Sequence, residues 1–139
     1  MKKIVLLPIL FTGIIMSTQV SAQSYLDQNI TSVISESTNY TNDGYVEIAA
    51  SDGIEYRAST KDHSIKQITH TMNGARIDGA TCGSEFVESN MSYKLIQDWN
   101  HGNERYRTYS TPDGEVLMVT TRSNVVISLT EYSKSIANC

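Results

Sequence analysis

Basic residues, cysteine and proline are scarce in this chain of 139 residues. Lysine and arginine total 11 against 15 aspartates and glutamates, and there are two cysteines and two prolines. Nucleic acids and anionic membranes are bound mainly through lysine and arginine, so the scarcity of these residues argues against both as partners. No Cys-x-x-Cys spacing occurs, which removes the usual zinc-ribbon and dithiol redox motifs.

Motifs that would define a catalytic or cofactor site are also missing. The chain has no Gly-x-Ser-x-Gly elbow, no glycine-rich phosphate loop and no calcium-loop pattern. His63 and His70 lie seven residues apart without a cysteine or carboxylate cluster at ligand spacing. The sequence therefore predicts no cofactor, no metal site and a non-enzymatic protein, with an enzyme of unfamiliar type as a third hypothesis.

The first 22 residues resemble a secretory signal peptide. Two lysines precede the apolar stretch Ile4–Met16, and a small-x-small ending follows at Ala22. The alternative is a membrane anchor, but the stretch is shorter than the roughly 20 residues that span a bilayer. We expect cleavage after Ala22, a single mature domain over 23–139, no membrane insertion after cleavage, and a periplasmic or secreted bacterial location.

The mature chain would be strongly acidic. All 15 acidic residues follow the cleavage site, whereas two of the basic residues are removed with the leader, which leaves nine and a formal charge of −6. Such a surface suits a cationic protein partner, here an exported or secreted enzyme, although solubility alone also explains it.

Two cysteines in an exported chain predict one disulfide, between Cys82 and Cys139. Closing a loop of this length stabilises a fold by roughly 4 kcal/mol in the chain-entropy model. A reactive thiol and a metal pair are the alternatives, and neither has a supporting motif nearby.

The N-terminal part of the mature chain has the spacing of a short helix. Leu26, Ile30, Val33 and Ile34 recur on one helical face within residues 24–38. An extended segment is the alternative, because the region is rich in β-branched residues.

After this segment, turn signals recur about every ten residues, which predicts an antiparallel meander. The predicted strands cover residues 45–50, 54–59, 64–72, 75–82, 91–99, 104–110, 115–121 and 125–132. A helix is the alternative for 64–73, but the Asn73-Gly74 turn favours a hairpin that joins 64–72 to 75–82. We expect a mainly β fold, α+β with a short N-terminal helix, in which the meander forms a small eight-stranded barrel or sandwich. Both cysteines would then lie at one end of the domain.

The stretch "QDWNHGNERYR" (97–107) is the first candidate binding surface. It holds the only tryptophan, Trp99, together with His101 and Arg105 around a predicted turn at Gly102. Exposed tryptophan beside arginine is typical of interface anchors. The alternative is a tryptophan buried under the mouth of a barrel.

The connection "GSEFVESN" (83–90) is the second candidate. Its apolar residues Phe86 and Val87 lie between Glu85 and Glu88, so a tethered loop could enter a cationic cleft. The alternative is that Phe86 and Val87 cover one end of the core.

Together these features predict an exported, non-enzymatic binding protein. The first hypothesis is a periplasmic inhibitor or immunity protein that blocks an enzyme such as a cell-wall hydrolase or an antibacterial effector. The second is a β-barrel that binds a small molecule or glycan, including a receptor-binding toxin subunit. A homodimer is left open.

Overall fold

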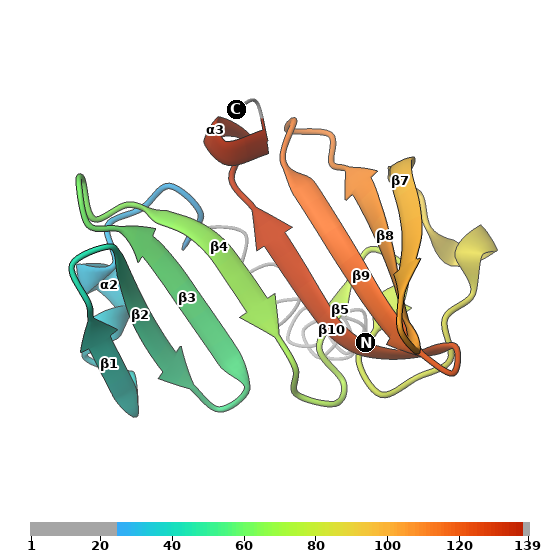
Figure 1. Ribbon diagram of the computed structural model, residues 1–139, viewed down its shortest axis with the longest axis horizontal. Coiled ribbons are helices and arrows are strands. Elements are labelled where there is room, and N and C mark those ends of the chain that lie inside the picture. Colours follow the sequence, from blue (N-terminus) through green and yellow to red (C-terminus); the bar gives the residue numbers. More distant parts are fainter. Residues whose placement is uncertain (1–24, 138–139) are drawn as a thin grey trace, which may run out of the picture.

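A computed structural model describes residues 25–137, and one eight-stranded antiparallel sheet dominates it (Figure 1). The mainly β, antiparallel fold predicted from the sequence is confirmed. In chain order the strands of this sheet are β1 (Asn39–Asn42), β2 (Val46–Ser51), β3 (Ile54–Ser59), β4 (Ile65–His70), β7 (Lys94–His101), β8 (Glu104–Ser110), β9 (Val116–Arg122) and β10 (Val125–Tyr132). The predicted signal peptide, 1–22, lies outside the described residues.

The sheet consists of two four-stranded meanders placed side by side. Its order is β1-β2-β3-β4-β10-β9-β8-β7, so β4 and β10 join the halves. This seam pairs Gln67–His70 with Leu129–Tyr132 in antiparallel register. Because β1 and β7 are both edge strands, the sheet stays open and does not close into the predicted barrel.

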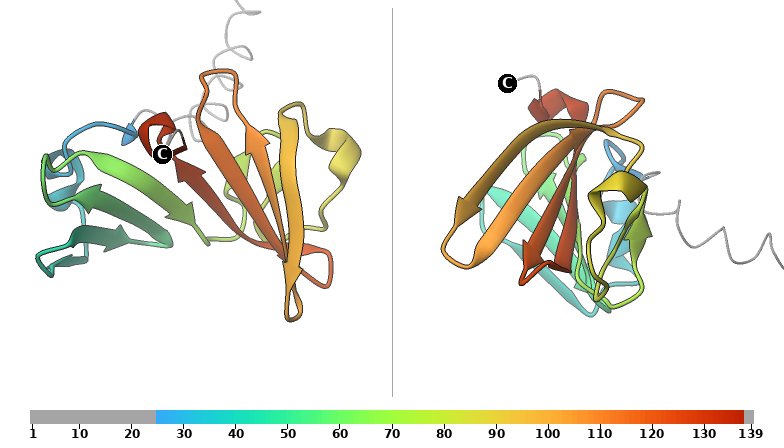
Figure 2. Two further views of the ribbon diagram at one scale, coloured as in Figure 1. Left: turned by 45° about the horizontal axis from the view of Figure 1, so that its top comes forward. Right: turned by 90° about the vertical axis from the view of Figure 1, so that its right-hand side faces the viewer.

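Most of the remaining elements lie on one face of the sheet (Figure 2). Helix α2 (Thr31–Ile34) covers the first half, and the two-stranded hairpin of β5 (Arg76–Ile77) and β6 (Ala80–Thr81) covers the second. The 3-10 helix η2 (Glu88–Asn90) follows this hairpin, and α3 (Lys134–Ala137) follows β10. We call this side of the sheet the covered face and the opposite side the open face.

Each half has its own hydrophobic core on the covered face, because alternate side chains of a strand point to opposite sides. In the first half, residues before β1 pack on the sheet, with the buried set Leu26, Ile30, Val33, Ala49, Ala58, Ile65 and Ile68. In the second half the buried set is Ile77, Ala80, Cys82, Phe86, Tyr109, Leu117, Val119, Val126 and Leu129.

The predicted short N-terminal helix is confirmed as α2, which covers only part of the segment 24–38, and its apolar face packs on the core. Asp27 has φ 67°, and its N–H donates to the carbonyl of Ile65 at 2.7 Å. The N–H of Ile65 donates in turn to the carbonyl of Gln28 at 2.7 Å. These bonds to the start of β4 leave only α2 helical, and β1 follows where no strand was predicted.

Strand β4 confirms the strand prediction for 64–73, but the predicted hairpin partner, 75–82, does not join the large sheet. It folds back on itself at Asp78-Gly79, where Asp78 has φ 55°. The Asp78 carboxylate accepts hydrogen bonds from Ser92 N–H, Ser92 Oγ and Tyr93 N–H at 2.6–2.9 Å. This hairpin is thereby fixed to the following segment, and β10 takes the position beside β4.

Gly79 lies where two backbone segments touch, and we expect Gly79→Ala to destabilise the fold. It is the one described glycine without a positive φ, and an added Cβ would lie 2.1 Å from the carbonyl oxygen of Asn90. Overpacking of this kind costs about 1–3 kcal/mol. Urea denaturation measures the loss, with Ser89→Ala on the exposed loop as a control expected to change stability by less than about 0.5 kcal/mol. Equal stability of the two variants would contradict the close contact.

Candidate functional site

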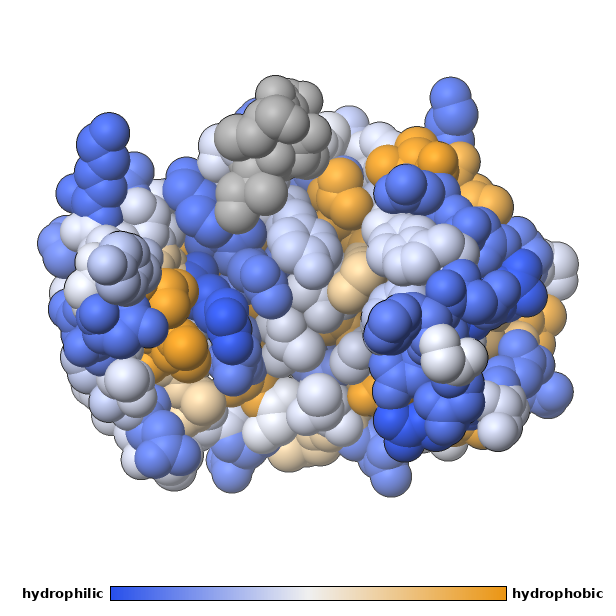
Figure 3. Space-filling view, viewed as in Figure 1, coloured by the Kyte–Doolittle hydropathy of each residue, from blue (hydrophilic) through white to orange (hydrophobic). Residues whose placement is uncertain are grey.

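The open face of the sheet is the candidate binding surface that the strand register defines. Side chains on it come from both halves: Val46, Ile48, Arg57, Gln67, Thr69, His101, Trp99, Tyr106, Met118, Thr120, Thr130 and Tyr132. Figure 3 shows this face, with residues of intermediate hydropathy, drawn pale, across its centre and hydrophilic and apolar ones on both sides. Among the described helices, α3 borders this face at the end of β10, and the rest of the face is available to a partner.

An aromatic pair stands near the β7 edge of the open face. Trp99 on β7 is opposite Tyr106 on β8, and their rings stack with centroids 5.3 Å apart and planes 17° apart. Trp99 keeps 38% of its surface exposed, so the alternative of a tryptophan buried in a barrel mouth is wrong. Stacking fixes both rings in place, and a rigid, half-exposed aromatic pair can enter an interface with little further loss of entropy.

The charges beside this pair are neutralised within the protein. Tyr106 donates to Glu104 at 2.6 Å and Arg122 forms an ion pair with the same carboxylate. The hydrogen bond from Tyr106, with help from Arg122, lowers the pKa of Glu104. The open face near the tip of the β7–β8 hairpin is therefore aromatic and close to neutral.

The predicted hairpin residues fall on two different faces. His101 is the last residue of β7, opposite Glu104 on the open face, and the turn is made by Gly102 with φ 64°. Arg105 lies on the other side, where it holds Asp98 through two hydrogen bonds of 2.7 and 2.9 Å. This contact lowers the pKa of Asp98. Trp99 and His101 thus share a surface, and Arg105 does not belong to it.

Phe86 is wrong as an exposed binding tip. It is 5% exposed in the second core, with the Arg107 guanidinium 4.5 Å above its ring. The connection 83–90 is fixed to the start of β10 by its backbone. Phe86 N–H donates to the carbonyl of Asn124, and Glu85 forms an isolated antiparallel β-bridge with Val125. Glu85 and Glu88 are exposed. The alternative role, covering the core, is confirmed for Phe86 alone, since Val87 stays 42% exposed.

Cys82 is buried and carries no disulfide in the structure, while Cys139 lies outside the described residues. The Cys82 thiol lies 3.4 Å from the carbonyl of His70, at the end of β4. Because β10 runs antiparallel to β4, its C-terminal end at Tyr132 points away from Cys82. Because Cys139 lies outside the described residues, its position relative to Cys82 and the bridge between them stay predictions.

We expect Cys82 to be inert in the folded protein. Burial raises the pKa of its thiol to about 11, so only about one molecule in a thousand is a thiolate at pH 8, against roughly a quarter for an ordinary cysteine. Iodoacetamide should modify Cys82 at least 100-fold more slowly in the folded protein than in the unfolded one, as measured by mass spectrometry. Rapid modification of folded Cys82 would contradict its burial, and failure of the unreduced, unfolded protein to react would show that the predicted bridge forms.

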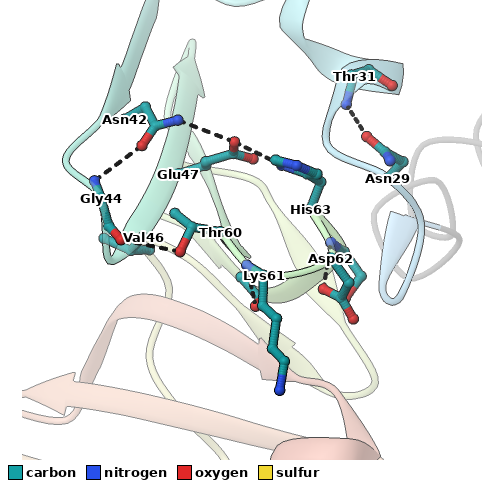
Figure 4. Close-up of polar contacts among 12 residues, drawn as sticks. Asn29, Thr31, Asn42, Gly44, Val46, Glu47, Thr60, Lys61, Asp62 and His63 are labelled. Atoms are coloured by element: carbon teal, nitrogen blue, oxygen red, sulfur yellow. Dashed lines mark hydrogen bonds and ion pairs between the residues drawn. The ribbon is translucent and has the colours of Figure 1, made fainter.

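A buried carboxylate and a histidine form a contact that the sequence analysis missed (Figure 4). Glu47 on β2 is 3% exposed, and one of its oxygens lies 2.8 Å from Nδ1 of His63 and 3.3 Å from the amide of Asn42. Its other oxygen is buried without a hydrogen bond in the described part of the chain. Residues two apart in a strand point to the same face, so the position of Glu47 two residues before the apolar Ala49 was the signal that its carboxylate lies on the covered face.

A second pair of this kind spans the seam between the two halves. His70 on β4 and Glu131 on β10 are both buried, and Nε2 of the imidazole lies 2.9 Å from a carboxylate oxygen. The second oxygen of Glu131 has no partner among the described residues. The partners are 61 residues apart in sequence, so no local pattern could have joined them.

Two searches over residues 25–137 gave negative results. No group of three or more histidine, cysteine, aspartate or glutamate side chains in this range is arranged to hold a metal ion. None of its helices has the length and apolar character needed to cross a membrane.

No protein-family model matches the chain, and no curated protein matches it. Among solved structures, it is similar to a cysteine-rich secretory protein from Staphylococcus aureus subsp. aureus Mu50, with a TM-score of 0.52 and 14% sequence identity. The match covers 81% of this chain but only 46% of that one, so the chain spans less than half of its length. At this identity the similarity shows a shared fold alone.

Proposed function

We propose that this protein is exported by a signal peptide and acts as a non-enzymatic inhibitor or immunity protein that blocks an enzyme. The enzyme would be a cell-wall hydrolase or an antibacterial effector with a cationic surface. The observation that carries this proposal is the open face, one side of an eight-stranded sheet that α3 borders at the end of β10 and that α2 and the β5–β6 hairpin leave free.

The dimensions of the open face suit a protein partner. Eight strands spaced by about 4.8 Å are about 34 Å wide, and strands of about six residues are about 20 Å long, which gives about 700 Å². One partner in a standard interface contributes about 800 Å². A protein can thus be bound on this face without rearrangement of the sheet.

The distribution of charge supports a cationic partner. Exposed aspartates stand at hairpin turns at the ends of the strands: Asp43, Asp52, Asp62 and Asp113. The aromatic pair lies on the open face of the second half, where the neighbouring Glu104 and Arg122 are already paired. Interfaces usually combine aromatic residues with a polar rim, and acidic rims accelerate association with cationic proteins at low salt.

Capture from periplasm and culture supernatant by the immobilised mature protein, followed by mass spectrometry, would identify the partner. The proposal requires that the captured protein is an enzyme whose activity falls in proportion to added inhibitor and reaches zero near equimolar amounts. Capture of an enzyme that stays fully active in the complex would refute inhibition.

A further inference from the structure

A hollow on the open face of the first half has the size of a small-molecule site. It has a volume of about 490 Å³ and lies over β2, β3 and β4 beside the start of α3. Its lining residues are Tyr45, Val46, Arg57, Ala58, Ser59, Lys66, Gln67 and Ser135. Ligand sites usually enclose about 300–1,000 Å³ and combine apolar walls with a few polar groups, as here.

The only charged residues in this lining are basic, in a protein that is acidic overall. Lys66 is already engaged, since its ammonium donates to Asp27 at 2.9 Å and to Ser135 at 3.0 Å. Arg57 donates only through Nε, to Glu55 at 2.8 Å, and its two terminal nitrogens make no hydrogen bond within the described residues. A guanidinium with two free parallel donors matches the geometry of a carboxylate.

Tyr45 lines the hollow and stands on a rigid turn. Tyr45 is 90% exposed, yet its backbone is fixed, because Asp43 accepts hydrogen bonds from the N–H groups of Tyr45 and Val46, both at 2.8 Å. Asn42 accepts from Gly44 N–H at 3.0 Å, and Thr60 holds the turn from the neighbouring loop at 3.2 Å (Figure 4). A ring that gains nothing from burial in the protein itself is suited to cover a ligand.

We propose that this hollow binds a small organic carboxylate. The carboxylate pairs with the terminal nitrogens of Arg57, and the apolar body of the ligand lies between Tyr45 and Val46. This inference does not depend on inhibition of an enzyme, because it concerns the first half of the open face and a small ligand.

Titration with octanoate, followed by two-dimensional ¹H–¹⁵N NMR of the protein, tests this site. We expect saturable shifts in the millimolar range at the backbone amides of Val46, Ser59 and Gln67. Octanamide, which keeps the chain but lacks the charge, should bind at least tenfold more weakly. Equal binding of the two probes, or no saturable shift with octanoate, would overturn the proposal.

Variants separate the roles of the two side chains. Arg57→Gln and Tyr45→Ala should each weaken octanoate binding by tenfold or more, whereas Arg122→Gln, at another exposed ion-paired arginine of the open face, should bind like the unaltered protein. Tyr45 is 90% exposed, so its truncation leaves the fold intact. Undiminished binding by both Arg57→Gln and Tyr45→Ala would show that octanoate binds elsewhere.

Discussion

Glu131→Ala is expected to lower the free energy of unfolding by about 3–5 kcal/mol, because it leaves His70 buried without its partner. Both side chains are less than a tenth exposed, and the seam that they span is the one place where the two halves of the sheet are joined by strand pairing. For a domain of this size such a loss is a large part of a total stability of about 5–15 kcal/mol. Urea denaturation at neutral pH measures it.

Glu47→Ala is the matched control, since it also removes a buried glutamate from a histidine. The side chain of His63 is 50% exposed and can be hydrated when its partner is lost, so this variant should cost clearly less. Replacing His70 and Glu131 together by leucine should recover part of the loss, because two apolar side chains leave no unpaired polar group. If Glu131→Ala proved at least as stable as Glu47→Ala, the seam pair would not stabilise the fold.

Trp99→Ala is expected to weaken binding of the captured enzyme by 2 kcal/mol or more, about 30-fold, as is typical of an aromatic anchor in an interface. Tyr106→Ala should have an effect of the same order, because it removes the ring on which Trp99 is stacked. Trp99 is 38% exposed, so its truncation should change folding stability little. Isothermal titration calorimetry gives the affinity, and thermal unfolding checks the fold.

Tyr40→Ala provides the control for this comparison. Tyr40 is 44% exposed, similar to Trp99, but the register with Ala49 places it on the covered side of β1. Its loss should leave the affinity unchanged. The open face would be the wrong surface if Tyr40→Ala weakened binding and Trp99→Ala did not. Phe86→Ala is uninformative here, because Phe86 belongs to the core.

Local signals in the sequence were sufficient for most of the strands. The turn at Asp52-Gly53 has φ of 47° and 79°, and Ser123 and Asn124 have φ of 52° and 65°, as tight hairpins between paired strands require. Segments rich in β-branched and aromatic residues between recurring turn signals, at 104–110, 115–121 and 125–132, also placed three neighbouring strands correctly. These features depend only on residues close in the chain, which is why they could be predicted.

Long-range pairing could not be predicted in the same way. Asn73-Gly74 and Asp78-Gly79 both form turns, and the hairpin around Asp78 is fixed by Ser92 and Tyr93, which bind Asp78 from a later segment. The inward position of Phe86 likewise depends on Asn124, 38 residues away. The open face could be recognised only once β4 and β10 were known to pair.

Trp99 offers the most direct test of the central claim, because it is the only tryptophan in the chain and lies on the open face. The protein is labelled with 5-fluorotryptophan, and its ¹⁹F resonance is followed while the captured enzyme is added. A partner bound on the open face should shift and broaden this resonance, with saturation at the stoichiometry of inhibition. An unchanged resonance in a sample where the enzyme is fully bound would contradict the account.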